Sequence, residues 1–402
     1  MHLEYNNQAY IVVCRRCPAF SMEERKAVNK KELREIRRRV RPDRTNIQHI
    51  YGCYVNSQKE IISTFDESLA LLSQEEQEKY ISILKKTLSG ALGRNLLDIS
   101  FTTRQVVDGD EHKLLSALRR TELKDTVLLD EFYKAIVSSL NLENMNYLIL
   151  LAFDAYDVPQ FDKNGEKDGE SNEVFNYILC SICPVKTGKP VLSYSNEENR
   201  FHNLSLAQVV ASPELGFMFP AFDDRSANIY NALFYSRDTK GVHEDFVDAV
   251  FKTEAPLSPL QQKEAFSAAV SSSLEKECSF DVLQSVHEEL RERIELHKES
   301  KDPDPLTVTA DDVCEILEKS GVSEERREAF IASCNERFGE NKPISPDNII
   351  NSRKFEISTE KVKISVSPEY SGFIRTQIID GKKYILIPAE AGAEVNGIPV
   401  II

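Results

Sequence analysis

The feature that most limits the fold of this chain is a pair of long apolar runs in its middle, Tyr147–Tyr156 and Val174–Val185. Neither approaches the roughly 18 apolar residues that a membrane-spanning helix needs. Val191–Tyr194, Gly216–Phe222 and Ile229–Tyr235 follow as further strand-like runs. Several connections are too short for the crossover helix that parallel strands require. The middle of the chain therefore predicts a largely antiparallel sheet.

Helical periodicity takes over after this region. The predicted helices are Asp245–Phe251, Leu260–Glu277, Phe280–Glu299, Ala310–Lys319 and Glu324–Phe338. The chain then returns to β runs, with Asp380-Gly381 as a strong hairpin signal. The predicted fold class is α+β, with a largely antiparallel sheet core, flanking helices, a helical segment and a small C-terminal β unit. The predicted boundaries are a leader over residues 1–28, an α/β core over 29–254, the helical segment over 255–351 and the β tail over 352–402.

The N-terminal part has two distinct stretches. Met1–Ala27 has no regular pattern, whereas an amphipathic helix begins at Asn29 with Leu33, Ile36 and Val40 on one face and ends before Pro42. We hypothesise that Met1–Ala27 extends the reading frame beyond a native start near Val28, or is a disordered leader.

Basic charge is concentrated on this helix. Eight basic side chains lie within residues 30–44: Lys30, Lys31, Arg34, Arg37, Arg38, Arg39, Arg41 and Arg44. Three acids oppose them, so the segment carries +5. With −15 for the whole chain and +1 before the segment, the remainder carries −21. An acidic body with one basic arm repels polyanions except at that arm.

Two interpretations of the basic helix remain open. It can contact the phosphates of DNA or RNA, with Lys and Arg releasing counterions without reading sequence. It can instead dock its apolar face on the protein and pair its Arg side chains with the acidic body. The run Arg37-Arg38-Arg39 favours the first, because one docked face cannot neutralise three adjacent cations.

The cysteines offer a second candidate site. Cys180 and Cys183 have the spacing of thiolate ligands, and Cys14 with Cys17 could complete a zinc site. However, strand alternation would place Cys180 and Ile182 on one face and Cys183 on the other. A redox pair and plain structural cysteines are the alternatives.

Four aspartates form the third candidate site. Asp154 and Asp157 end one predicted core strand, and Asp223 and Asp224 end another. If these strands pair, the carboxylates could bind a divalent cation and support phosphoryl chemistry. The alternative is that they cap turns and that Arg225 neutralises them. No catalytic motif accompanies them, and we expect a protein that is not an enzyme.

Several motifs together resemble one bacterial family. They are Asn29-Lys30-Lys31-Glu32-Leu33, Gly52-Cys53-Tyr54-Val55-Asn56, Leu88-Ser89-Gly90, Tyr156-Asp157-Val158-Pro159, Cys180-Ser181-Ile182-Cys183-Pro184-Val185-Lys186, the stretch from Gly216 to Arg225, and Glu394-Val395-Asn396-Gly397. From Asn29 to the C-terminus the chain resembles Domain of Unknown Function 4317, which implies a bacterial cytoplasmic protein and no mechanism. The tail, from Phe355 to Ile387, is more weakly similar to the family of the 37-kilodalton nucleoid-associated protein.

Three functional classes follow from these features. The first is a non-catalytic cytoplasmic nucleic-acid or nucleoid-associated protein that uses the basic helix. The second is a protein-interaction or scaffold module that forms a homo-oligomer through the helical segment and the tail. The third is a metal-dependent enzyme centred on the four aspartates. We expect no membrane partner.

Overall fold

The core of the protein is one eight-stranded sheet. A computed structural model describes residues 28–142, 144–160, 173–188, 191–204, 208–390 and 392–401. The strands of the sheet are β1 (His49–Val55), β2 (Ile61–Ser68), β3 (Leu96–Ser100), β4 (Asn146–Asp157), β5 (Val174–Thr187), β8 (Gln208–Val210), β9 (Leu215–Phe219) and β12 (Asn231–Ser236). They follow the order β2-β1-β4-β5-β9-β12-β3, with β8 paired to β5. Each pairing in this order is antiparallel, which confirms the predicted sheet.

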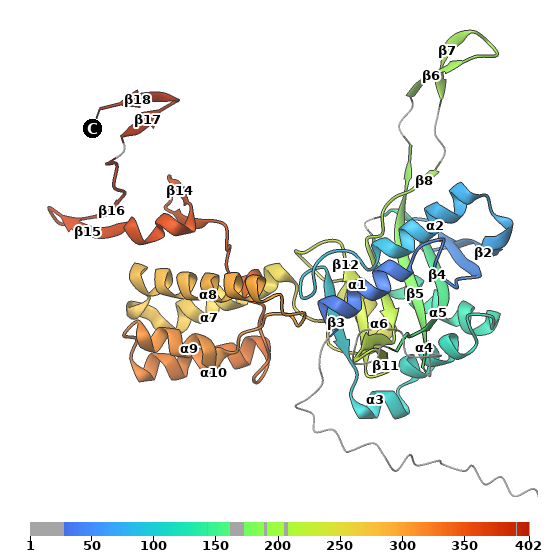
Figure 1. The fold of residues 1–402 in the computed structure, drawn as a ribbon, viewed down its shortest axis with the longest axis horizontal. Coiled ribbons are helices and arrows are strands. Elements are labelled where there is room, and N and C mark those ends of the chain that lie inside the picture. Colours follow the sequence, from blue (N-terminus) through green and yellow to red (C-terminus); the bar gives the residue numbers. More distant parts are fainter. Residues whose placement is uncertain are drawn as a thin grey trace, which may run out of the picture.

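Helices cover both faces of this sheet (Figure 1). One face carries α1 (Lys30–Arg39) and α2 (Gln74–Lys86); the other carries α3 (Thr103–Asp108), α4 (Asp110–Arg120), α5 (Thr126–Ser139) and α6 (Glu244–Phe251). Side chains alternate between two apolar cores, as the strand period requires. On β5, Cys180 and Ile182 lie in the core beneath α4–α6, whereas Tyr177 and Leu179 lie in the core beneath α1 and α2.

The helical segment builds a core of its own. It contains α7 (Pro259–Leu274), α8 (Phe280–Ser300), α9 (Ala310–Lys319), α10 (Glu324–Phe338) and α11 (Pro346–Ile349). A short 3-10 turn at Glu275–Glu277 follows α7. Two further 3-10 turns lie outside this segment, at Leu69–Leu71 after β2 and at Pro368–Phe373 in the C-terminal part. Phe266, Leu290, Leu317 and Phe330 are buried together in this third core. The predicted change from β to helical periodicity is confirmed.

The remaining strands form separate hairpins outside the large sheet. They are β6 (Val191–Ser195) with β7 (Arg200–Leu204), β10 (Ala221–Asp223) with β11 (Ser226–Asn228), β13 (Phe355–Ser358) with β14 (Lys363–Val366), β15 (Arg375–Ile379) with β16 (Lys382–Leu386), and β17 (Ala393–Val395) with β18 (Ile398–Val400). The β6–β7 hairpin and the last two hairpins extend away from the cores (Figure 1). Asp380 and Gly381 both have positive φ in the β15–β16 turn, as the Asp-Gly signal predicts.

Three local expectations needed correction. Val191–Tyr194, predicted as part of the large sheet, belongs to the separate β6–β7 hairpin. Gly216–Phe222, predicted as one strand, is divided between β9 and β10, with a cis peptide bond between Phe219 and Pro220. The short helix α3 was not predicted; Thr102 and Gln105 cap it reciprocally. None of the helices in the described residues combines the length and apolar character needed to cross a membrane.

Candidate nucleic-acid interface

Helix α1 is fixed in orientation by its apolar face and its N-terminal cap. Leu33, Ile36 and Val40 are buried in the core under α1 and α2, as predicted. The Asn29 side chain accepts hydrogen bonds from the backbone N–H groups of Lys31 and Glu32, and Glu32 accepts one from the N–H of Asn29 at 3.0 Å. This reciprocal cap satisfies donors that a helix start otherwise leaves free. The basic side chains therefore project at defined angles.

Two of the predicted phosphate-binding arginines are engaged by the protein itself. Arg37 donates to the carbonyl oxygens of Leu88 and Gly90, the latter at 2.6 Å. Arg39 donates to Asp154 at 3.3 Å and to the carbonyl oxygen of Ala155 at 2.9 Å. For Arg37 and Arg39, the docking interpretation matches the observed contacts.

The other cations of this segment are placed differently. The side chains of Lys31, Arg34 and Arg38 are exposed and make no hydrogen bond or ion pair with any other described residue. Their spacing of three, four and seven residues puts them on one face of α1. Lys30 lies 3.1 Å from His297, and Arg41 and Arg44 form exposed pairs with Asp43 at 3.1 and 3.6 Å. Exposed pairs of this kind contribute little free energy.

An open basic pocket lies beside this exposed face. Its volume is about 710 Å³, and six cations line it: Lys31, Arg34, Arg38, Arg39, Arg44 and Arg225. Among the described residues, the carboxylates in the lining are those of Glu35 and Asp157. The pocket therefore carries an excess of positive charge in a molecule that is acidic as a whole.

The floor of the pocket is a hydrogen-bonded network that sequence reasoning did not identify. Arg225 donates to Glu35 and to the carbonyl oxygen of Pro159, both at 2.7 Å. Tyr156 donates to Glu35 at 2.6 Å, and its ring lies 4.9 Å from the Arg39 guanidinium. Burial, followed by the Glu35 carboxylate, raises the pKa of the Tyr156 hydroxyl, so it stays a donor at neutral pH. The sequence could not predict this network, because residues 35, 156 and 225 are far apart along the chain.

The four candidate aspartates have separate environments. Asp154 is fully buried and accepts hydrogen bonds from Arg39, Thr45, the backbone N–H of Asn46, and Tyr177. Asp157 is exposed at the end of β4, and Asp224 is exposed in a turn with φ of +47°. Asp223 accepts a hydrogen bond from Asn228 at 3.1 Å. In the part of the chain described here, no three His, Cys, Asp or Glu side chains are grouped so that they could hold a metal ion.

The candidate cysteines lie inside the sheet. Cys180 and Cys183 are fully buried on β5, and burial raises the pKa of the Cys183 thiol to about 12. Cys180 shares its core with Ile182, as the alternation predicted. Such thiols remain protonated at neutral pH, which suits structural cysteines better than thiolate ligands. Cys14 and Cys17 lie outside the described residues.

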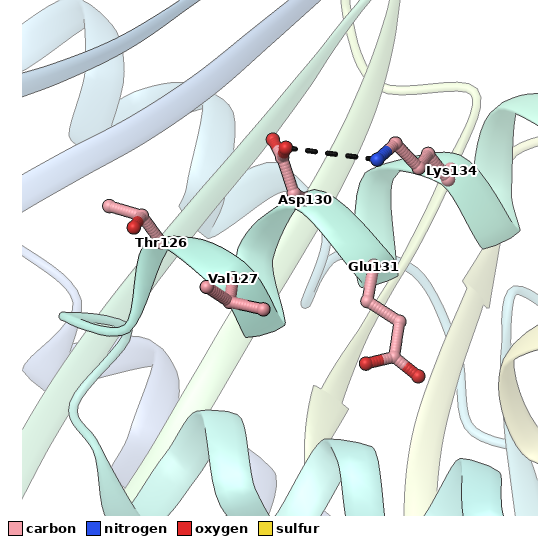
Figure 2. Close-up of a pocket in the computed structure, with 5 residues that line it drawn as sticks. All are labelled: Thr126, Val127, Asp130, Glu131 and Lys134. Carbon is pink, nitrogen blue, oxygen red and sulfur yellow. Dashed lines mark ion pairs between the residues drawn. The ribbon is translucent and has the colours of Figure 1, made fainter.

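A smaller pocket of about 390 Å³ lies on α5 (Figure 2). Thr126, Val127, Asp130, Glu131 and Lys134 line it, and all five belong to that one helix. Asp130 and Lys134 form an exposed ion pair at 3.9 Å. The pocket is therefore a surface groove along a single helix, and it assembles no side chains from different elements.

The fold and the basic pocket define a class of protein: an α+β chain whose N-terminal helix lies on one face of an antiparallel sheet and presents cations beside the sheet's strand ends. Within this class, the chain belongs to the family described as Domain of unknown function (DUF4317), which matches residues 28–398. This confirms the resemblance drawn from the sequence motifs. No curated protein matches the sequence significantly.

Proposed function

We propose that this protein is a non-catalytic, cytoplasmic nucleic-acid-binding protein of bacteria that contacts phosphates through the exposed face of α1. The observation that carries the proposal is that some cations on α1 are bound by the protein itself and others are not. Arg37 and Arg39 are held by the protein, whereas Lys31, Arg34 and Arg38 have no partner among the described residues. Like charges three and four residues apart destabilise a helix. An approaching phosphate backbone would remove that repulsion.

The charge of the rest of the molecule also favours α1 as the surface that meets the phosphates. The segment after Arg44 carries −21 in total, so a polyanion is repelled from most of the surface and meets attraction at α1. Arg39 and Arg225 line the same pocket as the exposed cations. Contacts of this kind position a protein on nucleic acid without reading its sequence. The weak similarity of the tail to a nucleoid-associated family agrees with such a role.

We expect binding of duplex DNA to fall steeply with salt. If Lys31, Arg34, Arg38 and Arg44 each contact a phosphate, the slope of log affinity against log salt is about −3.6, which is roughly a 150-fold loss between about 50 and 200 mM salt. The variant Lys31→Gln/Arg34→Gln/Arg38→Gln should reduce the slope to about −1. Fluorescence anisotropy with a labelled duplex and a labelled single strand measures both.

The matched control removes three lysines from other helices. Lys79→Gln/Lys113→Gln/Lys134→Gln changes the net charge equally, and the three side chains are exposed on α2, α4 and α5. The control should retain the original slope. Equal slopes for the two triple variants, or binding that does not respond to salt, would show that α1 is not the interface. These charge variants are sharper than deleting α1, which would also remove the buried Leu33, Ile36 and Val40.

A second candidate function is a protein-interaction module that forms an oligomer. Ile378 and Ile398 on the terminal hairpins are 67% and 66% exposed. Isolated two-stranded hairpins are only marginally stable in water, and burying such side chains against a second copy would stabilise them.

Light scattering over a micromolar concentration range tests this second function. We expect a mass above that of one chain, and Ile378→Lys/Ile398→Lys should shift the protein to a monomer. Leu71→Lys is the matched control and should leave the mass unchanged. Leu71 is 87% exposed and lies in the 3-10 turn after β2, outside the terminal hairpins. A monomer at every concentration would contradict the oligomer.

A further inference from the structure

A second cavity lies on the other side of α1, between the sheet core and the helical segment. Its volume is about 630 Å³, within the range of small-molecule sites. The charged or titratable side chains in its described lining are Lys30, Arg34, Arg37, Asp98, His297, Asp304 and Asp347. They come from α1, β3, α8, the connection between α8 and α9, and α11. Unlike the groove on α5, this cavity collects side chains from distant parts of the chain.

Hydrogen bonds join the walls of this cavity. The backbone N–H of Lys30 donates to the carbonyl oxygen of Pro303 at 2.8 Å. The Asn348 side chain donates to the carbonyl oxygen of Gly93 at 2.7 Å and to Gln262 at 3.0 Å. Asn348 is buried, so these bonds are protected from water. They link the core directly to the helical segment, and the cavity between them is therefore preformed.

Asp98 is the unusual side chain of the cavity. Leu97 and Ile99 point into the core beneath α4–α6, so alternation along β3 directs Asp98 to the α1 face. The residue keeps some exposure at the cavity wall, but its Oδ1 atom is buried and has no hydrogen-bond partner among the described residues. The carboxylate accepts one hydrogen bond, from the backbone N–H of Val28. A buried oxygen without a partner costs free energy, and a donor from a ligand would remove that cost.

Helix α1 contributes the cations of the cavity. The Arg34 side chain has no hydrogen-bond or ion-pair partner in the described part of the chain, the Lys30 ammonium lies 3.1 Å from the His297 ring nitrogen, and Arg37 is held by the Leu88 and Gly90 carbonyl oxygens. Burial, and then repulsion from Arg34, lowers the pKa of Arg37. An anion at this wall would relieve that repulsion. A dianionic phosphate suits three adjacent cations better than a single carboxylate.

We infer that this cavity binds a small organic phosphate carrying an amino group, with the phosphate at Lys30 and Arg34 and the amine at Asp98. The inference goes beyond nucleic-acid binding, because the cavity lies on the other side of α1 from the basic pocket. Arg34 borders both, whereas Lys31 and Arg38 border only the basic pocket, and Asp98 borders only this cavity. Variants at Asp98 and at Lys31 with Arg38 therefore separate the two sites.

The test uses matched pairs of probes on the full chain, measured by calorimetry near neutral pH. Phosphoethanolamine is compared with ethyl phosphate, and glucosamine 6-phosphate with glucose 6-phosphate, with inorganic phosphate alongside. At least one amino phosphate should bind about tenfold or more tightly than its amine-free partner, the value of one hydrogen bond to a charged group. Asp98→Asn should reduce this preference to about one.

Two further measurements complete the test. The variant Lys31→Gln/Arg38→Gln should keep the preference for the amino phosphate, since neither side chain lines the cavity. Circular dichroism of Asp98→Asn verifies that it folds. Failure of both amino phosphates to bind at millimolar concentration, or an unchanged preference in folded Asp98→Asn, would overturn the inference, whatever the outcome of the salt experiment with DNA.

Discussion

Asp154→Ala is expected to lower the free energy of unfolding by about 3–5 kcal/mol, the usual cost of removing one partner from a buried charged network. The Asp154 carboxylate is fully buried and accepts from Thr45 at 2.9 Å and from Tyr177 at 2.8 Å. It also pairs with Arg39 of α1. Alanine would leave the fully buried Tyr177 hydroxyl without its acceptor and would remove the counter-ion of Arg39, whose side chain is only 14% exposed.

Urea denaturation of matched variants tests this expectation. Asp157→Ala lies three residues further along the same strand at an exposed position, and it should change stability by no more than about 0.5 kcal/mol. Asp154→Asn keeps one acceptor oxygen and should fall between the two. If Asp154→Ala were as stable as Asp157→Ala, the network would contribute nothing, and Asp154 would be free for another role.

The predicted role of Asp154 shows where sequence reasoning about this site reached its limit. The strand Asn146–Asp157 could be recognised from its apolar run, and the run implied that an aspartate near its end lies close to the core. What Asp154 contacts could not be predicted, because Arg39 and Thr45 are more than a hundred residues away in the chain. The metal hypothesis needed the four aspartates to converge, whereas Asp154 turns toward α1.

For helix α1, in contrast, most of the structure could be predicted from the sequence. Its start, its apolar face and its end follow from Asn29, from the spacing of Leu33, Ile36 and Val40, and from Pro42, all of which are local signals. The same periodicity fixes which arginines point away from the core. It could not show that carbonyl groups at Leu88 and Gly90 would engage Arg37, because those groups are positioned by the turn after α2.

Asp98 could not be recognised as a candidate site residue from the sequence, because its strand has an ordinary pattern of apolar and polar residues. Leu97 to Ser100 alternates apolar and polar residues as a half-exposed strand does. The polar face of such a strand normally faces water. Here the helical segment closes over that side, with Pro305 and Ser345 among the residues lining the cavity. Only tertiary packing turns an ordinary strand aspartate into a buried carboxylate.

Asp98→Asn is expected to stabilise the protein at alkaline pH and to have little effect in acid. Burial raises the pKa of Asp98 to about 7, and the negative charge of Asp223 contributes, while the Val28 N–H opposes the shift. The unfolded pKa is about 3.9. Between these values the folded protein holds a proton that the unfolded chain has released, so stability falls as pH rises through this window. Asparagine has no proton to lose and escapes this penalty.

Urea denaturation at about pH 5 and pH 8 measures this effect as a difference between wild type and variant. The advantage of Asp98→Asn should grow by about 2–3 kcal/mol between the two pH values, because each unit of pKa shift corresponds to about 1.4 kcal/mol. Lys30, Arg34 and Arg37 line the same cavity and would reduce the gain if they approach the ionised carboxylate more closely on titration. Asp157→Asn, at the exposed end of β4, is the matched control. A difference that stays constant from pH 5 to pH 8 would contradict a pKa of about 7 for Asp98 in the folded protein.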